Sequence, residues 1–402
     1  MVTIPRLHDV VEEILPGIIA DRRFLHENPE LGFQEVKTST FVAERLESLG
    51  VEDIRTGINK TGVTGLIRGS GSGPGKERVV LVRADMDALP ILEANDVEYR
   101  SKNEGTMHAC GHDAHTAILL GLARVLIERK DQFAGTVKVL FQPAEELPPG
   151  GAEGMIREGV LEDPHVDAVF GLHMAQDQPV GKISVGSGPV MAAADGFRIR
   201  IQGKGGHGAY PSYCVDPIVA GAQIILALQT LVSRETDPTK SAVISTCFFD
   251  SGDAFNVIPD IAELGGTVRT FDLELRDFLQ KRVPEVAEGV GKALRAEVEV
   301  DYTLGYPSTV NDEGATEIVR EAVREVVGEE HLLVTEPKMG GEDFSYFLIE
   351  RPGAFFFIGS NNEEKGLTWG HHHPRFDIDE ESMGIGLETM AATVTKYLES
   401  GL

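Results

Sequence analysis

The sequence predicts an α/β protein: a mixed sheet covered by helices forms a larger domain, and a smaller α+β domain is inserted into it. Two observations support this prediction. Short apolar runs alternate with helical stretches in the first and last parts of the chain, which is typical of α/β proteins. From about residue 188 to 304, strands instead alternate apolar and polar residues. We therefore expect a larger domain at residues 1–187 and 305–402, and an inserted domain at residues 188–304.

The larger domain is expected to begin with two helices. Apolar residues recur at helical spacing from Leu7 to about Glu27 and again over residues 38–49, where Gly50 ends the pattern. The glycine-rich segment 69–77 follows the first expected strand. Its residues do not match a phosphate-binding Walker motif, and we expect a flexible hairpin loop there. Strands are expected at 63–68, 79–83, 137–141, 168–172 and 354–358, and further helices at 112–129, 316–327 and 379–397.

The inserted domain is expected to combine strands that have one solvated face with two long helices. Residues 197–202 (FRIRIQ) alternate apolar and polar side chains, and residues 262–270 follow the same habit. Helical periodicity covers residues 216–232 and 273–294. Strands and helices in this proportion predict a compact α+β domain.

The net charge and the cysteine content exclude some classes of partner and of protein. The formal net charge of −27 repels phosphate backbones, so we expect no nucleic-acid partner. The three cysteines, Cys110, Cys214 and Cys247, are too few and too scattered for a disulfide framework, and the two later ones are expected in the core of the inserted domain. We find neither a signal peptide nor a stretch of about 18 apolar residues, and we expect a cytoplasmic protein without a membrane segment.

Potential metal ligands gather where predicted strands end. Cysteine, histidine and carboxylate side chains are common metal ligands, and the carboxyl ends of strands form the usual binding edge of an α/β sheet. The segments are RADMDALP (83–90), MHACGHDAHTA (107–117), FQPAEE (141–146), GLHMAQDQPVG (171–181) and GHHHPRFDIDE (370–380). Each segment alone also has an interpretation without a metal, such as the start of a helix or a solvated acidic loop. Their shared placement is what favours a metal site.

Taken in order, these segments resemble the peptidase M20 family. The resemblance also includes HENPELGFQE (26–35), GKGGHGAYP (203–211), FNVIPD (255–260) and MGGEDFSYF (339–347), and it runs over nearly the whole chain. The similarity is greatest to the amidohydrolase branch, which includes hippurate hydrolases, N-acyl-amino-acid amidohydrolases and auxin-conjugate hydrolases. Peptidase branches have an H-x-D motif where this chain has Asp85-Met86-Asp87, and this departure disfavours a dipeptidase or desuccinylase.

The resemblance implies a catalytic domain that binds two divalent cations, and an inserted lid domain of the dimerisation type. It implies five metal ligands: Cys110, His112, Glu146, His173 and His372. We choose His372 among the three consecutive histidines because the ligand of the family lies two residues before a proline. The ions are Mn, Zn, Co or Ni, since a mixed sulfur, nitrogen and oxygen set suits several of them.

The resemblance also implies catalytic and substrate-binding residues. Glu145 resembles the general base, and His207 the histidine that stabilises the developing oxyanion, in its own site or in that of a neighbouring subunit. Asn256 and Arg269 resemble residues that hold the carbonyl and the carboxylate of the substrate. Alternatively, Arg269 forms an ion pair with Asp272 and has a structural role instead of binding the substrate.

The expected function is therefore hydrolysis of N-acyl-L-amino acids by metal-activated water, with Glu145 as the general base. The expected oligomeric state is a homodimer or homotetramer assembled through the lid. Two alternatives stay open: a metallocarboxypeptidase or dipeptidase of the same superfamily, and a catalytically silent metal-containing binding protein. Retention of Glu145 beside the ligand Glu146 argues against the silent protein.

Overall fold

The computed structural model describes residues 5–400, with side chains from Leu7 onward. The chain divides into two compact units, which are described separately. The larger comprises Met1–Val190, Val310–Glu336 and Asp343–Leu402, and the smaller comprises Met191–Thr309 and Pro337–Glu342. The short segment Pro337–Glu342 thus joins the smaller unit, although it lies beyond the inserted range expected from sequence.

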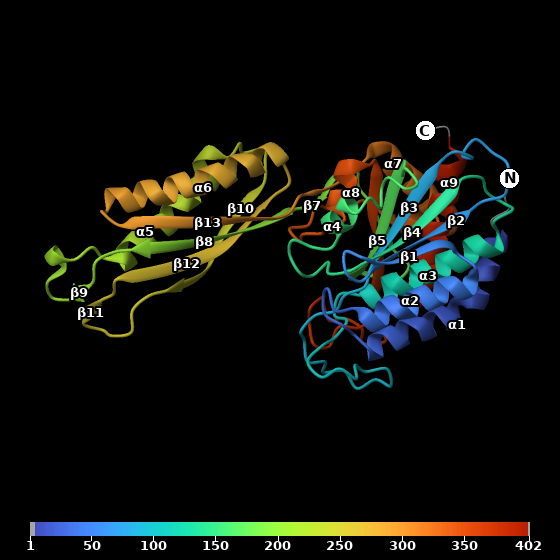
Figure 1. Ribbon diagram of the computed structural model, residues 1–402, viewed down its shortest axis with the longest axis horizontal. Coiled ribbons are helices and arrows are strands. Elements are labelled where there is room, and N and C mark those ends of the chain that lie inside the picture. The colour runs from blue at the N-terminus through green and yellow to red at the C-terminus, as the bar shows by residue number, and fades with distance from the viewer. Residues whose placement is uncertain (1–4, 401–402) are drawn as a thin grey trace. The chain divides into compact units, whose positions relative to one another are not determined.

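A mixed sheet forms the centre of the larger unit (Figure 1). Within residues 5–400 it has eight strands in the order β1-β2-β4-β3-β5-β16-β6-β15. Neighbours β4, β3, β5 and β16 run parallel, whereas β1 pairs with β2, and β2 with β4, in antiparallel fashion. The strands are β1 (Glu52–Ile58), β2 (Gly62–Arg68), β3 (Val79–Asp85), β4 (Thr136–Gln142), β5 (Ala168–Pro179), β6 (Ile183–Ser184), β15 (Leu332–Leu333) and β16 (Gly353–Asn361).

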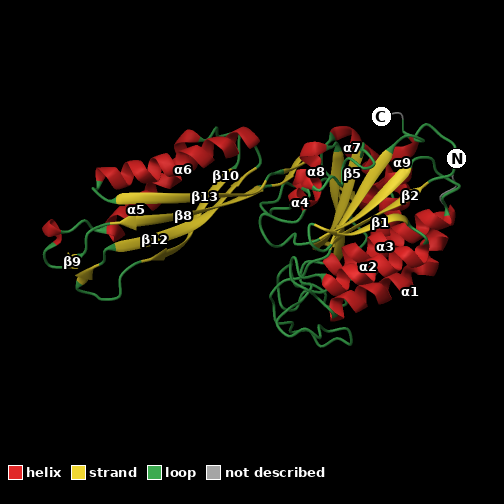
Figure 2. Ribbon diagram, viewed as in Figure 1, coloured by secondary structure: helices red, strands yellow, loops and turns green. Residues whose placement is uncertain are grey.

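Helices pack on this sheet and on one another (Figure 2). They are α1 (Pro5–Glu27), α2 (Val36–Leu49), α3 (His112–Glu128), α4 (Ala152–Arg157), α7 (Glu313–Val326), α8 (Ser345–Glu350) and α9 (Glu381–Glu399). Helix α3 is buried along nearly its whole length, between α1, α2, α9 and the sheet. This burial fixes the amino end of α3, which carries His112.

The smaller unit packs two helices against an antiparallel sheet. Among the described residues this sheet has four strands in the order β10-β12-β8-β13. They are β8 (Ala193–Gln202), β10 (Ala242–Asp250), β12 (Ile261–Thr270) and β13 (Glu297–Tyr306), with helices α5 (Pro217–Thr230) and α6 (Leu273–Ala293). A ribbon of β9 (Gly206–His207) and β11 (Val257–Ile258) forms a second sheet in this unit. Strand β7 (Gly188–Met191) pairs with β14 (Thr309–Asn311), and most residues of these two strands belong to the larger unit. The predicted fold class is confirmed.

Three expectations from the sequence were wrong. Segment 69–77 is not a hairpin loop, because β4 lies between β2 and β3. The strand expected at 168–172 continues to Pro179, so His173 lies inside β5 and not after its end. Cys214 is buried, as expected, but Cys247 is exposed on β10, whose later side chains mostly face outward. The first expectation failed because a local sequence pattern does not reveal the order of strands in a sheet. Cys247 is exposed because β10 is an edge strand, which has no neighbouring strand on one side.

One helix, Pro217–Glu235, is long and apolar enough to cross a membrane by length and composition alone, which is weak evidence because core helices share these features. It joins α5 to a following π-helical turn, and 33% of its most apolar part is buried. Its buried side chains include Ala220, Ile224 and Leu228, which belong to the core of the smaller unit. One face of this helix therefore packs in the core of the smaller unit.

Candidate metal centre

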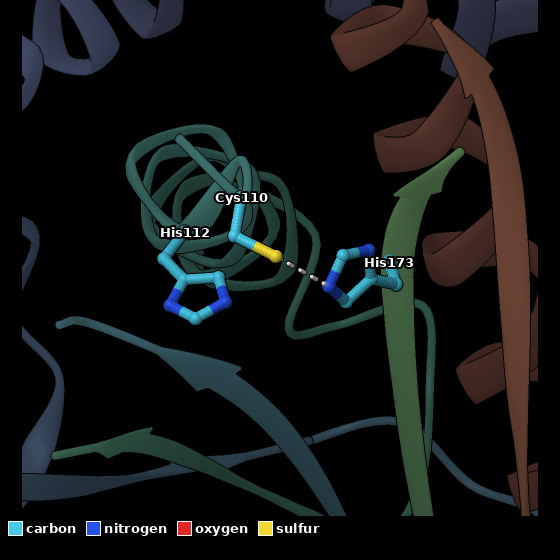
Figure 3. Close-up of side chains that lie close together, drawn as sticks. All are labelled: Cys110, His112 and His173. Atoms are coloured by element: carbon cyan, nitrogen blue, oxygen red, sulfur yellow. Dashed lines mark hydrogen bonds between the residues drawn. The ribbon is translucent and has the colours of Figure 1, made fainter. Parts of the chain in front are cut away.

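Potential ligands from separate segments of the larger unit converge in the structure. Cys110, His112 and His173 form one group in which the ligand atoms all lie within 4.8 Å of one another (Figure 3). Cys110, Glu146 and His372 form a second group by the same criterion, and His112, Glu145 and Glu146 a third. Of these three groups, Cys110, His112 and Glu146 each belong to two. The structure thus brings together the five residues expected as ligands and the expected base.

His112 presents its Nε2 atom to the cluster. Its Nδ1–H donates to the backbone oxygen of Asp87 at 2.9 Å, so in the neutral ring, the form that binds a metal, Nε2 is the acceptor nitrogen. His112 is 1% exposed, and among the described residues its Nε2 has no hydrogen-bond partner. A buried ring nitrogen with no partner needs an explanation, and a bound cation is one.

His173 presents its Nε2 atom in the same way from β5. Its Nδ1–H donates to the backbone oxygen of Met174 at 2.7 Å. Nε2 lies 3.6 Å from the Cys110 sulfur, as the dashed line in Figure 3 marks. Burial lowers the pKa of His173 well below its usual value, and His115 and His371 lower it further. A neutral imidazole is the form that binds a metal.

Gly111 explains why Cys110 and His112 can both face the cluster. It precedes α3 with a φ of 93°, a left-handed conformation that suits glycine. A Cβ atom there would lie 3.2 Å from the Met174 side chain, tighter than most such contacts. The close approach brings the start of α3 against β5, next to His173.

The loop after β4 carries the two adjacent carboxylates. Asp87 accepts the backbone amides of Glu145 and Glu146, at 3.0 and 2.9 Å. Ala144, just before them, has a φ of 55°, which is uncommon outside glycine and typical of functional loops. Glu145 is 6% exposed. The loop thus holds two neighbouring carboxylates beside His112.

His372 is the member of the triple histidine that meets Glu146. Its Nε2 lies 3.1 Å from Glu146 Oε1, and its amide donates to the backbone oxygen of Ala109 at 2.8 Å. His371 instead contacts the Gln176 amide, and His373 stacks on Trp369 with ring centroids 4.2 Å apart. His372 also has a positive φ, of 63°. This geometry favours the choice of His372 made from sequence.

The electrostatics of the cluster favour a cation. Burial lowers the pKa of His112, but Asp85, Asp87 and Glu146 outweigh burial and raise it to about 10. Burial raises the pKa of the Cys110 thiol well above its usual value, and Glu146 and Glu145 raise it further. Without positive charge the thiol stays protonated, and a bound cation would reverse this preference. The donor set, with sulfur, nitrogen and carboxylate oxygen, fits divalent transition metals.

The three expected residues of the smaller unit do not lie together. His207 pairs with Val257 across the β9–β11 ribbon, and the Gly208 amide donates to the backbone oxygen of Asn256 at 2.8 Å. Arg269 lies near the far end of β12, and the eight steps from Ile261 to Arg269, at about 3.3 Å each, span roughly 26 Å. His207 and Asn256 are therefore neighbours, and Arg269 is remote from both.

Arg269 does not form the ion pair with Asp272 that was its structural alternative. Asp272 caps α6 and pairs with Lys240 at 2.7 Å. The guanidinium of Arg269 donates to the Thr267 hydroxyl and to backbone oxygens, and within residues 5–400 it forms no salt bridge. A half-buried cation without an acidic partner is suited to an anionic ligand.

Sequence reasoning missed several residues that hold the centre in place. Asp87 and Glu35 bind the amides of the loop after β4, and His115 joins Asp85 to the backbone of β5. For His115 the available signal was its spacing of three residues from His112 on one helix. His108 lies in the same segment, 107–117, but neither of its ring nitrogens has a hydrogen-bond partner among the described residues. Glu35 lies more than a hundred residues from the loop, and nothing local reveals its contact.

Known proteins resemble this chain over nearly its whole length. Thermostable carboxypeptidase 2 of Saccharolobus solfataricus is 41% identical over 397 residues, which cover 98% of this chain and 98% of that protein. IAA-amino acid hydrolase ILR1-like 4 of Arabidopsis thaliana is 40% identical over 385 residues, which cover 95% of this chain and 86% of that protein.

A protein of known structure has the same fold and a related sequence. This Bacillus subtilis protein, described as a dinuclear metal binding peptidase from the M20 family, matches with a TM-score of 0.83 at 38% identity, over 96% of this chain and 99% of that chain. The family model described as Peptidase family M20/M25/M40 matches residues 81–396. The chain belongs to peptidase family M20/M25/M40.

Proposed function

We propose that this protein is a metal-dependent amidohydrolase that cleaves N-acyl-L-amino acids. The observation that carries the proposal is the convergence of Cys110, His112 and His173 with Glu146 and His372, directly beside the buried Glu145. Relatives named for the hydrolysis of amino-acid conjugates support the substrate class. The five residues would hold two divalent cations, whose identity among Mn, Zn, Co and Ni stays open.

The chemistry divides between the cations and Glu145. Divalent cations in such a centre supply Lewis acidity, which makes water more acidic and polarises a carbonyl oxygen. Glu145 takes a proton from the attacking water and gives it to the amine nitrogen as the amide C–N bond breaks. The acyl carbon keeps the hydroxyl group as a carboxylic acid, and the amino acid leaves with its amine. Asp87 holds the amide of Glu145 and so limits where its carboxylate can reach.

The smaller unit would act as a lid that binds the substrate. In this proposal His207 donates to the oxyanion, Asn256 binds the carbonyl, and Arg269 binds the free carboxylate. Arg269 lies roughly 26 Å along β12 from Ile261, which is three residues after the ribbon that holds His207, from about 3.3 Å per residue. The separation favours a homodimer or homotetramer in which one copy supplies His207 to the site of another.

A cytoplasmic location stays a prediction, which the three unpaired cysteines support.

A metallocarboxypeptidase is the second candidate function. A relative named thermostable carboxypeptidase 2 is 41% identical to this chain, and a peptide with a free C-terminus offers the same amide and carboxylate. The two functions differ in the acyl side of the bond. Parallel assays of N-acyl amino acids and dipeptides therefore separate them.

Metal analysis of purified variants tests the centre. We expect wild-type protein to bind two divalent ions per chain and Glu145→Ala to bind the same number. Cys110→Ser and Glu146→Ala are expected to lose at least one ion, and Asp177→Ala, an exposed carboxylate outside the cluster, serves as the matched control. Full metal content in Cys110→Ser and Glu146→Ala would exclude these residues as ligands.

A further inference from the structure

We propose that Glu35 is a positioning residue that sets the direction of Glu145. Glu35 ends the segment HENPELGFQE, which the proposed function leaves without a role. The inference rests on the proposed function, because Glu145 is the base only in that reaction. Glu35 would act through the backbone of Ala144 and would not touch the substrate.

Both oxygens of the Glu35 carboxylate are engaged. The backbone amide of Ala144 donates to Oε1 at 2.8 Å, and the hydroxyl of Thr61 donates to Oε2 at 2.6 Å. Glu35 is 0% exposed. A buried carboxylate with two short hydrogen bonds is held in one orientation, and so is the amide that it binds.

The amide that Glu35 binds belongs to a strained residue. Ala144 has a φ of 55°, a left-handed conformation that is unfavourable for an alanine. The next two amides, of Glu145 and Glu146, donate to Asp87 at 3.0 and 2.9 Å. Three successive amides are therefore held by two carboxylates. Without Glu35, the bond that holds the strained residue itself is lost.

Local structure around Glu35 does not explain its inward direction. Glu35 is the residue before α2, the position from which a side-chain oxygen often caps a helix, but its side chain makes no capping bond. Glu30 does this instead, by accepting the amides of Lys37 and Thr38 at 3.2 and 2.9 Å. Burial raises the pKa of Glu35, which measures the cost of placing a charge there. The hydrogen bond to the Ala144 amide is a reason for burying a carboxylate at this position despite the unfavourable desolvation.

Hydrogen exchange measured by mass spectrometry tests the contact without any turnover. Glu35→Ala should speed exchange in the peptide that spans residues 143–147 by about 10-fold or more, the worth of a lost bond to a charged group. Glu35→Gln keeps an acceptor for the Ala144 amide and should exchange like wild type. Glu30→Ala is the matched control, because it loses contacts to α2 but none to the loop.

Steady-state kinetics test whether the contact serves Glu145. With two bound metal ions retained, Glu35→Ala should lower kcat about 10- to 100-fold and change KM less than about 3-fold, because the acid–base step depends on the carboxylate position. Glu35→Gln should restore most of kcat. In the Glu145→Asp background, which keeps a carboxylate and so a measurable rate, Glu35→Ala should lower kcat less than it does in wild type, since residues that act as a unit are not additive.

The outcomes separate this inference from the proposed function. Wild-type exchange at residues 143–147 in Glu35→Ala overturns the inference whatever the enzyme hydrolyses. An equal fall of kcat in wild type and in the Glu145→Asp background overturns it as well, because Glu35 would then not act through residue 145. A wild-type protein that hydrolyses no amide refutes the proposed function, whereas the exchange experiment still decides whether Glu35 holds the loop.

Discussion

The Nε2 atom of His115 accepts the backbone amide of Met174 at 2.9 Å. The other ring nitrogen, Nδ1, donates to Asp85 Oδ1 at 2.7 Å. Burial lowers the pKa of His115, which agrees with a neutral ring that donates once and accepts once. Through this residue, α3 is tied to β5 at the position next to His173. The distance between two proposed ligands thus depends on a histidine that is not itself a ligand.

Replacement of His115 should weaken metal binding more than it weakens the fold. His115→Phe keeps the volume but loses both hydrogen bonds, and we expect metal affinity to fall about 10- to 100-fold. His115→Gln should retain part of the affinity. Competition titration with a coloured chelator measures the change, and the absorption of Co²⁺-loaded protein reports the Cys110 ligand. His108→Phe removes a buried histidine that has no hydrogen bond in the described chain, and equal losses in both variants would contradict the account.

A buried charge cluster beneath α3 should control stability. Arg22 is 0% exposed and pairs with Asp113 at 2.7 Å and with Asp377 at 2.8 Å. Arg22→Met leaves Asp377 buried without its arginine and Asp113 with His26 alone, and we expect the free energy of unfolding to fall by about 3–5 kcal/mol. Arg23→Met, at a neighbouring exposed arginine paired with Glu380, should change it by less than about 1 kcal/mol. Urea unfolding of metal-free protein measures both, and similar midpoints for the two variants would refute the prediction.

His26 should make stability depend on pH. Burial and Arg22 lower its pKa, but hydrogen bonds to Asp113 and Glu93 outweigh them and raise it to about 9 in the folded protein. Since the folded pKa exceeds the usual 6.5, the stabilisation is fully present below pH 6.5 and is lost as the pH rises through 9. The difference in unfolding free energy between wild type and His26→Gln should shrink by about 3 kcal/mol over this window.

A His26→Gln difference that grows with pH would have the wrong sign for a raised folded pKa and would contradict the assignment.

Arg269 should discriminate between substrates by their carboxylate. We expect Arg269→Ala to lower kcat/KM about 10- to 100-fold for N-acyl amino acids, which corresponds to roughly 1.5–3 kcal/mol for a charge-assisted hydrogen bond. The methyl esters or amides of the same substrates should lose little. Arg198→Ala, an exposed arginine on β8 of the same sheet, is the matched control. An equal loss for acids and esters would mean that Arg269 supports the fold alone.

The sequence predicted the fold class and the grouping of the proposed ligands because both depend on local pattern. Apolar periodicity identified α1, α3 and most central strands, and ligand-type residues near strand ends indicated one shared edge. Strand order was not predictable, since segment 69–77 looks like a hairpin connection although β4 separates its two strands. The supporting contacts of Glu35 and Arg22 were missed because they join residues more than ninety positions apart.

Hydrolysis by metal-stripped protein, with and without added Mn²⁺, tests the central claim most directly. The substrates are N-acetyl-, N-benzoyl- and indoleacetyl-amino acids beside dipeptides, and Glu145→Ala is the blank. The account predicts release of the amino acid from N-acyl substrates that requires the metal and disappears in the variant. Cleavage of dipeptides alone would favour the carboxypeptidase function. No turnover of any substrate by protein that still binds its metal would contradict the account and identify a silent metal-binding protein.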